Sequence, residues 1–283
     1  MYAELVALVA SITTALSSVM ATRGMRDSNP DTANLVLTGI QTVVLSVLLV
    51  FDLPPLNYGA LFWYALAGVC GSFFARLLTM MSYKRIGVSA GSALIGTSPV
   101  VTTILAVLFL GEPLLLAVVL GAFCVVAGIA FINLKDGRLS IDWSLVYIPL
   151  GASFLYALSN IIRKMGTNLQ PHAVLGAQVS TLAGLVACGV YLAAKGGFRD
   201  LEINRDNVWW LAGAGAVNAF AWITVTMAIN LGRVSVASSI IYSYPLFSLL
   251  LSRLLLRDEY YNHYMVIGSL FIVVGVAIVS LFG

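Results

Sequence analysis

The chain has 283 residues, of which 60% are hydrophobic and only 10% are charged, and its mean hydropathy is +0.97. A soluble globular chain is roughly 45–50% apolar and about 25% charged. The composition therefore excludes an ordinary soluble enzyme, a nucleic-acid-binding protein and a disordered chain, and it predicts a polytopic protein of the lipid bilayer. The net charge of +3 fits the basic loops of such proteins.

Ten apolar segments follow one another along the chain, separated by short polar turns. A helix that spans a bilayer needs about 20 mostly apolar residues. The apolar runs are continuous and do not alternate, which favours helices over strands. The predicted spans are 2–21, 31–51, 58–83, 88–110, 114–134, 144–162, 173–194, 208–231, 234–256 and 261–282.

The two halves of the sequence resemble each other. Val88–Pro99 aligns with Val234–Pro245 at a constant offset of 146, with five of the twelve positions identical. Because each copy has an odd number of spans, the second copy enters the bilayer from the opposite side. The predicted fold class is an all-α membrane protein of ten transmembrane helices, arranged as two inverted five-helix repeats, 1–140 and 141–283.

An inverted repeat predicts two related half-gates around one central site, and hence alternating access. Pro99 and Pro245 fall at matching positions inside the fourth and ninth spans, where a proline removes a backbone hydrogen bond. They are candidate gate hinges, and static curvature of the helix is the alternative.

Polar side chains are unevenly distributed among the spans. The fifth and tenth have almost none, so we expect them at the periphery, in contact with lipid or with a second copy in a homodimer. The other eight carry polar or aromatic side chains at helical spacing, which predicts a shared central cavity. Small hydroxyl and amide side chains also bond across helix seams, and for the amides both interpretations stay open. Besides Arg76, the candidate substrate-binding residues are Ser18, Gln41, Ser92, Asn160, Gln178, Asn218, Trp222, Ser238 and Tyr242.

Arg76 is the one charge placed well within a predicted span. Its side chain is predicted to contact an anionic group of a substrate, to extend to the membrane surface, or to stack on Trp222, its counterpart at offset 146. No Asp or Glu lies in the middle of a span, which counts against exchange of organic cations for protons. Arg163 and Lys164 are predicted to end the sixth span.

Enzyme signatures are missing from the sequence. It contains no HExxH motif, no pair of intramembrane aspartates and no Walker loop, so neither an enzyme nor an ATP-driven pump is predicted. The three cysteines lack CxxC spacing, and we expect no metal or cofactor.

Three strings in order along the chain resemble one transporter superfamily. They are Ser98-Pro-Val…Leu110-Gly-Glu112, its second copy Tyr244-Pro-Leu…Leu256-Arg-Asp-Glu259, and Tyr156-Ala-Leu-Ser-Asn160 before Arg163-Lys164. The chain is similar to the drug/metabolite transporter superfamily, in its EamA-type ten-helix branch. The resemblance implies a basket in which helices one to four and six to nine line the cavity. It also implies transport of small metabolites, often export of amino acids, without assigning a substrate or any binding residue.

The distribution of basic residues bears on orientation. Loops after odd-numbered spans hold eleven Lys and Arg, and loops after even-numbered spans hold three. The positive-inside rule therefore places both termini outside the plasma (inner) membrane, whereas relatives are generally described with both termini inside.

The leading functional hypothesis is a secondary transporter, exporting a small polar metabolite such as an amino acid or another carboxylate. The alternatives are a multidrug exporter of neutral aromatic compounds and a membrane receptor subunit that binds a ligand without moving it.

Overall fold

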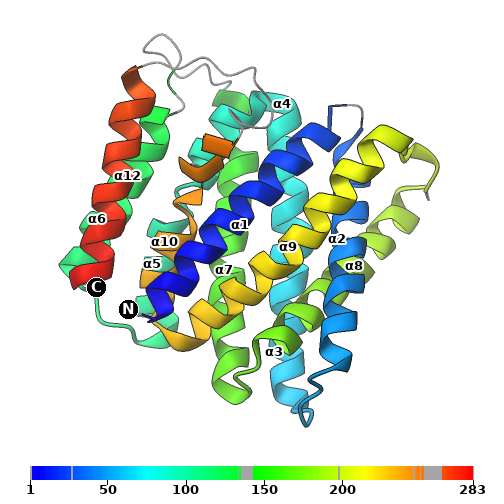
Figure 1. The fold of residues 1–283 in the computed structure, drawn as a ribbon, viewed down its shortest axis with the longest axis horizontal. Helices are drawn as coiled ribbons and strands as arrows, with labels where there is room; N and C mark the ends of the chain where they lie inside the picture. The colour runs from blue at the N-terminus through cyan, green and yellow to red at the C-terminus, as the bar shows by residue number, and fades with distance from the viewer. Residues whose placement is uncertain are drawn as a thin grey trace.

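The computed structural model of the chain is helical in every part that it describes. It describes residues 2–26, 28–132, 134, 143–196, 198–244, 246–248, 250–251 and 263–282, without the side chains of 86–93, 132, 263, 265–266, 269 and 280. No strand occurs among these residues (Figure 1).

The described helices are distributed over both halves of the chain. The first half contains α1 (Tyr2–Gly24), α2 (Pro30–Val50), α3 (Tyr58–Gly68), the π-helix η1 (Val69–Ala75), α4 (Arg76–Ile95), α5 (Ser98–Leu110) and α6 (Leu116–Ile132). The second half contains α7 (Tyr147–Leu169), α8 (Ala173–Lys195), α9 (Arg205–Leu231), α10 (Val234–Ile241) and α12 (His263–Phe282), with short 3₁₀ turns at Trp143–Leu145 and Phe198–Asp200.

Five described segments are long and apolar enough to cross a bilayer: 2–24, 30–50, 58–85, 173–195 and 205–231. Shorter apolar helices cover 98–110, 116–131 and 270–279. The chain is therefore an integral membrane protein by composition and helix length, while the count of ten spans stays a prediction.

Asparagine residues are the N-caps of several helices. Asn29 accepts a hydrogen bond of 2.8 Å from the backbone N–H of Thr32, and Asn204 accepts one of the same length from Asn207. These bonds satisfy backbone donors that the first turn of a helix leaves free. At the other end of α5, Gly111 adopts a left-handed conformation with φ of 65° and stops the helix.

The predicted break after Tyr83 is absent, because the backbone stays helical through Lys84 and Arg85 as far as Ile95. Lys and Arg are good helix formers, so two basic residues at a membrane surface do not require a helix to end. The chain breaks instead at 96–97, just before α5.

Pro99 lies in the first turn of α5, where a missing backbone N–H removes no helical hydrogen bond. The predicted kink inside a span is thus a break between two helices. In the second half, α10 ends at Ile241 and is followed by a turn at Tyr242 and Ser243. Pro245 lies outside the described residues.

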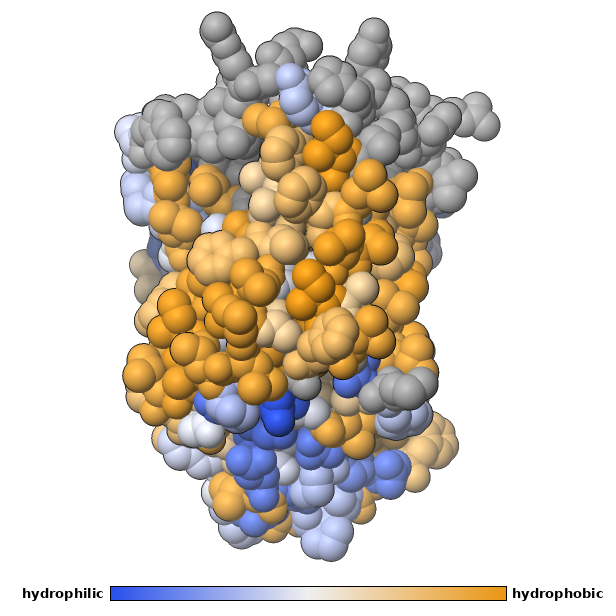
Figure 2. All heavy atoms as spheres, turned by 90° about the vertical axis from the view of Figure 1, so that its left-hand side faces the viewer, coloured by the Kyte–Doolittle hydropathy of each residue, from blue (hydrophilic) through white to orange (hydrophobic). Residues whose placement is uncertain are grey.

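The helices α6 and α12 form one edge of the molecule (Figure 1). Glycines bring them together: a Cβ atom added at Gly275 would lie 2.7 Å from the backbone oxygen of Gly121. Their outward side chains are apolar and exposed, among them Phe123 and Leu270, and Figure 2 shows a largely hydrophobic surface on this side. The peripheral placement expected for the fifth and tenth spans agrees with this arrangement.

The remaining helices surround the middle of the molecule. The helix α1 packs along α9, and α7 packs along α3, η1 and α4, while α2 lies against α8 and α9. The turn after α1 and the turn between α8 and α9 lie at one end of the bundle, called here the upper end (Figure 1). The turns between α2 and α3 and between α9 and α10 lie at the other, lower end.

Candidate functional site

A cavity lies among α1, α4, α7, α9 and the turn after α10. It encloses about 920 Å³ of space free of protein atoms, part of it open to solvent. Thr22 and Met25 of the α1 end and Tyr83 of α4 belong to its lining, so the cavity reaches toward the upper end.

The cavity wall combines polar and aromatic side chains. Its hydroxyl and amide groups come from Thr14, Ser17, Ser18, Thr22, Thr79, Asn160 and Asn218, and its aromatic rings from Tyr83, Tyr156, Trp222, Tyr242 and Tyr244. Among the described lining residues, Arg76 is the only charged one. Such a wall suits a molecule with a polar group and an apolar body.

The π-helix η1 ends directly before Arg76. A π-helix adds a residue to a turn and so shifts the face on which the following side chains lie. The Arg76 side chain is 4% exposed, and its Nη1 donates to Thr38 Oγ1 at 2.9 Å and to Gln41 Oε1 at 3.0 Å. Its Nη2 donates to Asn218 Oδ1 at 2.9 Å, so α2 and α9 together orient the guanidinium.

All three of these acceptors are neutral, and no carboxylate of the described residues pairs with Arg76. Among the described residues, Lys195 forms an ion pair with Asp31, and His172 Nε2 lies 3.1 Å from Asp52 Oδ2, both at helix ends. Because the guanidinium points to α2 and α9, the interpretation in which it extends to the membrane surface is wrong. Its carbon lies 5.9 Å from the centre of the Trp222 ring, a loose cation–π contact.

Five of the other sequence-predicted residues line the cavity with Arg76. They are Ser18, Asn160, Asn218, Trp222 and Tyr242.

The remaining predicted residues lie away from the cavity lining. Gln41 is fully buried and acts by holding Arg76, and Gln178 donates to Ser46 Oγ at 2.7 Å, a bond across the seam between α8 and α2. Ser238 donates to the Ser235 carbonyl of its own helix at 3.1 Å. The side chain of Ser92 lies outside the described residues.

The prediction that Arg163 ends a span is wrong. The helix α7 continues to Leu169, and Arg163 is fully buried inside it. Its Nη1 donates to Ser180 Oγ at 3.2 Å and to Thr226 Oγ1 at 3.1 Å, and its guanidinium carbon lies 4.2 Å from the centre of the Trp222 ring. The spacing of Asn160, Arg163 and Thr167 continues one polar helix face and was the signal available in the sequence.

Two charged side chains stabilise the turn between α9 and α10 at the lower end by hydrogen bonds to its backbone. Glu112 accepts hydrogen bonds from the backbone N–H of Val234 at 2.6 Å and of Ser235 at 3.2 Å, and from Ser235 Oγ at 2.5 Å. Lys164 Nζ donates to the carbonyls of residues 229, 230 and 232 at 2.7, 3.4 and 3.0 Å. The negative charge of Glu112 thus lies at the N-terminus of α10, and the positive charge of Lys164 lies at the C-terminus of α9. The helix dipoles favour both placements.

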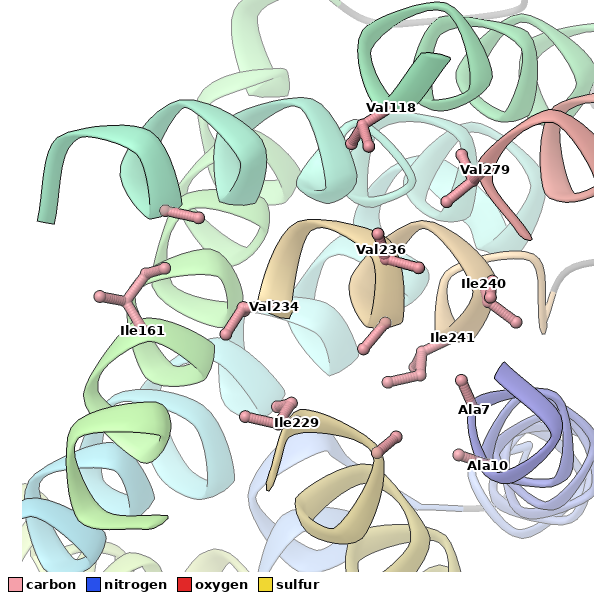
Figure 3. Packing of buried hydrophobic residues seen from close by; sticks show 13 residues of the cluster. Ala7, Ala10, Val118, Ile161, Ile229, Val234, Val236, Ile240, Ile241 and Val279 are labelled. Atoms are coloured by element: carbon pink, nitrogen blue, oxygen red, sulfur yellow. The ribbon is translucent and has the colours of Figure 1, made fainter. Parts of the chain in front are cut away.

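An apolar cluster closes the lower end beside this turn. Figure 3 shows Ala7 and Ala10 of α1 facing Ile240 and Ile241 of α10, and Ile229 of α9 lies nearby. All five are buried. The cavity is therefore separated from the lower end by packed side chains.

The fold and cavity define a polytopic α-helical membrane protein with a central cavity. The sequence profile described as EamA-like transporter family matches residues 1–134 and 143–281, and the chain belongs to this family. It is thus a membrane transporter of the drug/metabolite transporter superfamily, whose members are transporters and not enzymes.

Comparison with solved structures supports the same fold. One chain, titled "Crystal structure of protein", superposes with a TM-score of 0.83 over 100% of this chain and 99% of its own length, at 15% identity. No curated protein sequence matches the chain.

Proposed function

We propose that the chain is a secondary transporter that exports a small metabolite with an anionic group, such as an amino acid or another carboxylate, by alternating access. The observation that carries the proposal is Arg76, a buried cation in the cavity wall whose hydrogen-bond acceptors are all neutral. A substrate carboxylate supplies the missing negative charge.

The energy of a contact between Arg76 and its ligand supports an anionic substrate group. A buried charge is costly in a membrane unless it is paired, and a hydrogen bond to a charged group contributes about 1.5–3 kcal/mol. A carboxylate also matches the planar guanidinium better than a neutral oxygen does. Asn218 and Gln41 hold the guanidinium in place, and Asn160 and Ser18 offer bonds to other polar parts of the substrate.

The closed lower end and the cavity reaching the upper end support alternating access. The pairing of α1 with α9 resembles the pairing of α7 with α3–α4, as two repeats exchanged by a twofold axis require. Seven basic residues of the described chain lie at the upper end, and this supports a cytoplasmic location for that end. They are Arg23, Arg26, Lys84, Arg85, Lys195, Arg199 and Arg205. A cavity that reaches the cytoplasmic side suits an exporter, because the substrate enters from there.

The second candidate function is export of neutral aromatic compounds. It is favoured by the five aromatic side chains in the lining. Transport of neutral compounds should not depend on Arg76, because the positive charge adds little to the binding free energy of a neutral compound. Transport of carboxylates should depend on it.

The test is uptake of the twenty labelled amino acids into proteoliposomes that contain the purified protein. Arg76→Leu should reduce carboxylate flux by about tenfold or more, while Arg85→Leu, the same change at an exposed site on the same helix, should leave it unchanged. Flux of neutral aromatic compounds that survives Arg76→Leu, without carboxylate flux in the unmodified protein, would favour the second candidate. Binding without any flux would identify a receptor subunit.

A further inference from the structure

Arg163 is a second buried cation, and it does not belong to the cavity lining. Its side chain is 0% exposed. The hydroxyls of Ser180 and Thr226 accept from Nη1, but Nε and Nη2 have no hydrogen-bond partner among the described residues. None of the ion pairs in the described part of the chain includes it.

This environment is incomplete for a guanidinium. A buried donor without a partner costs free energy, and the cost is larger when the group is charged. A purely structural arginine is expected to use all of its donors on protein acceptors. Two unpaired nitrogen atoms therefore point to a partner that arrives in another state of the protein.

Arg163 and Arg76 both approach the ring of Trp222. Their guanidinium carbons lie 4.2 Å and 5.9 Å from its centre. Trp222 and Arg76 line the cavity, whereas Arg163 does not. The ring thus contacts one cation inside the cavity and one beyond it.

The position along α7 places Arg163 on the side of the closed lower end. Asn160, which lines the cavity, precedes it by three residues, about 4.5 Å along a helix axis. The next residue, Lys164, bonds the carbonyls at the end of α9 in the lower-end turn. A substrate that moves from the cavity to the lower end must therefore pass the level of Arg163.

We propose that Arg163, with Ser180, Thr226 and the Trp222 ring, forms a second anion-binding position that takes the anionic group of the substrate when the lower end opens. The inference rests on the proposed function. The free Nε and Nη2 donate to the anion, so the anionic group stays paired as it moves from Arg76 to Arg163. The Trp222 ring contacts the guanidinium groups of both positions.

The kinetic test uses proteoliposomes with L-leucine and L-leucinamide as probes, which share a side chain but differ in the carboxylate. Arg163→Gln should lower the initial rate of L-leucine flux by about tenfold or more and change L-leucinamide flux much less, because only the charged group uses the guanidinium. Arg163→Lys, which keeps the charge, should recover part of the L-leucine flux. Arg205→Gln, at the upper start of α9, is the matched control.

Equal losses for both probes, or unchanged L-leucine flux in Arg163→Gln, would overturn the inference and leave the proposed function standing. Absence of carboxylate flux in the unmodified protein would instead overturn the proposed function.

A labelling experiment tests whether Arg163 attracts an anion, and it does so even if the Arg163→Gln protein does not fold. Thr226→Cys, in a background that lacks Cys70, Cys124 and Cys188, is treated from the lower side with an anionic sulfonate or a cationic trimethylammonium methanethiosulfonate. We expect the anionic reagent to react at least several-fold faster, because the Arg163 charge attracts it. Equal rates, or no reaction with either reagent, would show that Arg163 is not on an anion path.

Discussion

Replacing Asn218 by aspartate should give Arg76 a permanent partner and exclude the substrate. Nη2 of Arg76 lies 2.9 Å from Oδ1 of Asn218, and the exchange of an amide for a carboxylate hardly changes the shape of that side chain. The carboxylate formed by Asn218→Asp would occupy the position from which the charge of Arg76 is balanced.

The magnitude follows from the separation of the two groups. Unit charges about 4 Å apart attract by about 4 kcal/mol at an effective dielectric constant of 20. Desolvation of the new carboxylate offsets part of this attraction, and we expect a net stabilisation of about 1–2 kcal/mol. A substrate carboxylate then meets a neutral pair, and its affinity should fall by about tenfold or more, since each tenfold corresponds to about 1.4 kcal/mol.

Two assays measure these effects. Thermal unfolding of the detergent-purified protein should shift to higher temperature in Asn218→Asp, and L-leucine uptake into proteoliposomes should fall. Asn160→Asp is the control, because it adds the same charge to the cavity wall at a residue that is not an acceptor for Arg76; it should not stabilise the protein. An Asn218→Asp protein with the original melting temperature and the original uptake would refute the role given to Arg76.

The other predictions concern the lower end and the peripheral helices. Glu112→Gln removes the negative charge at the start of α10, a loss of about 1.5–3 kcal/mol. In a protein that also carries Ala237→Cys, a thiol reagent should then react with the new cysteine about tenfold faster. An unchanged reaction rate would mean that Glu112 does not hold this end closed. Gly275→Val forces a side chain against the backbone of α6, at a typical cost of about 1–3 kcal/mol. It should lower the melting temperature, whereas Gly189→Val, which meets open space, should not.

The helical class was predictable because it depends on composition and on the length of apolar runs. The position of helix ends was less so. Lys84 and Arg85 looked like a turn, but basic residues at a membrane surface are compatible with a helix, and α4 continues through them. Arg163 looked like the end of a span for the same reason, although α7 continues past it and buries it.

The lining of the cavity was predictable where a polar group had a single role. Arg76 stood out because a charge inside an apolar run is costly unless it has a partner or reaches the membrane surface. Gln178 and Ser238 could not be sorted in advance, because an amide or hydroxyl at helical spacing serves a helix seam as readily as a cavity. The partners of Arg163 come from two other helices, α8 and α9, and only the packing of these helices against α7 brings them together.

The central claim is that the cavity recognises an anionic group through Arg76. Counterflow exchange in proteoliposomes measures it most directly, with labelled L-leucine and L-leucinamide compared in the unmodified protein and in Arg76→Leu. Exchange of L-leucine should exceed that of L-leucinamide by about tenfold or more in the unmodified protein, and the preference should vanish in Arg76→Leu. Equal exchange of the two compounds in the unmodified protein, or a preference that persists without Arg76, would contradict the claim.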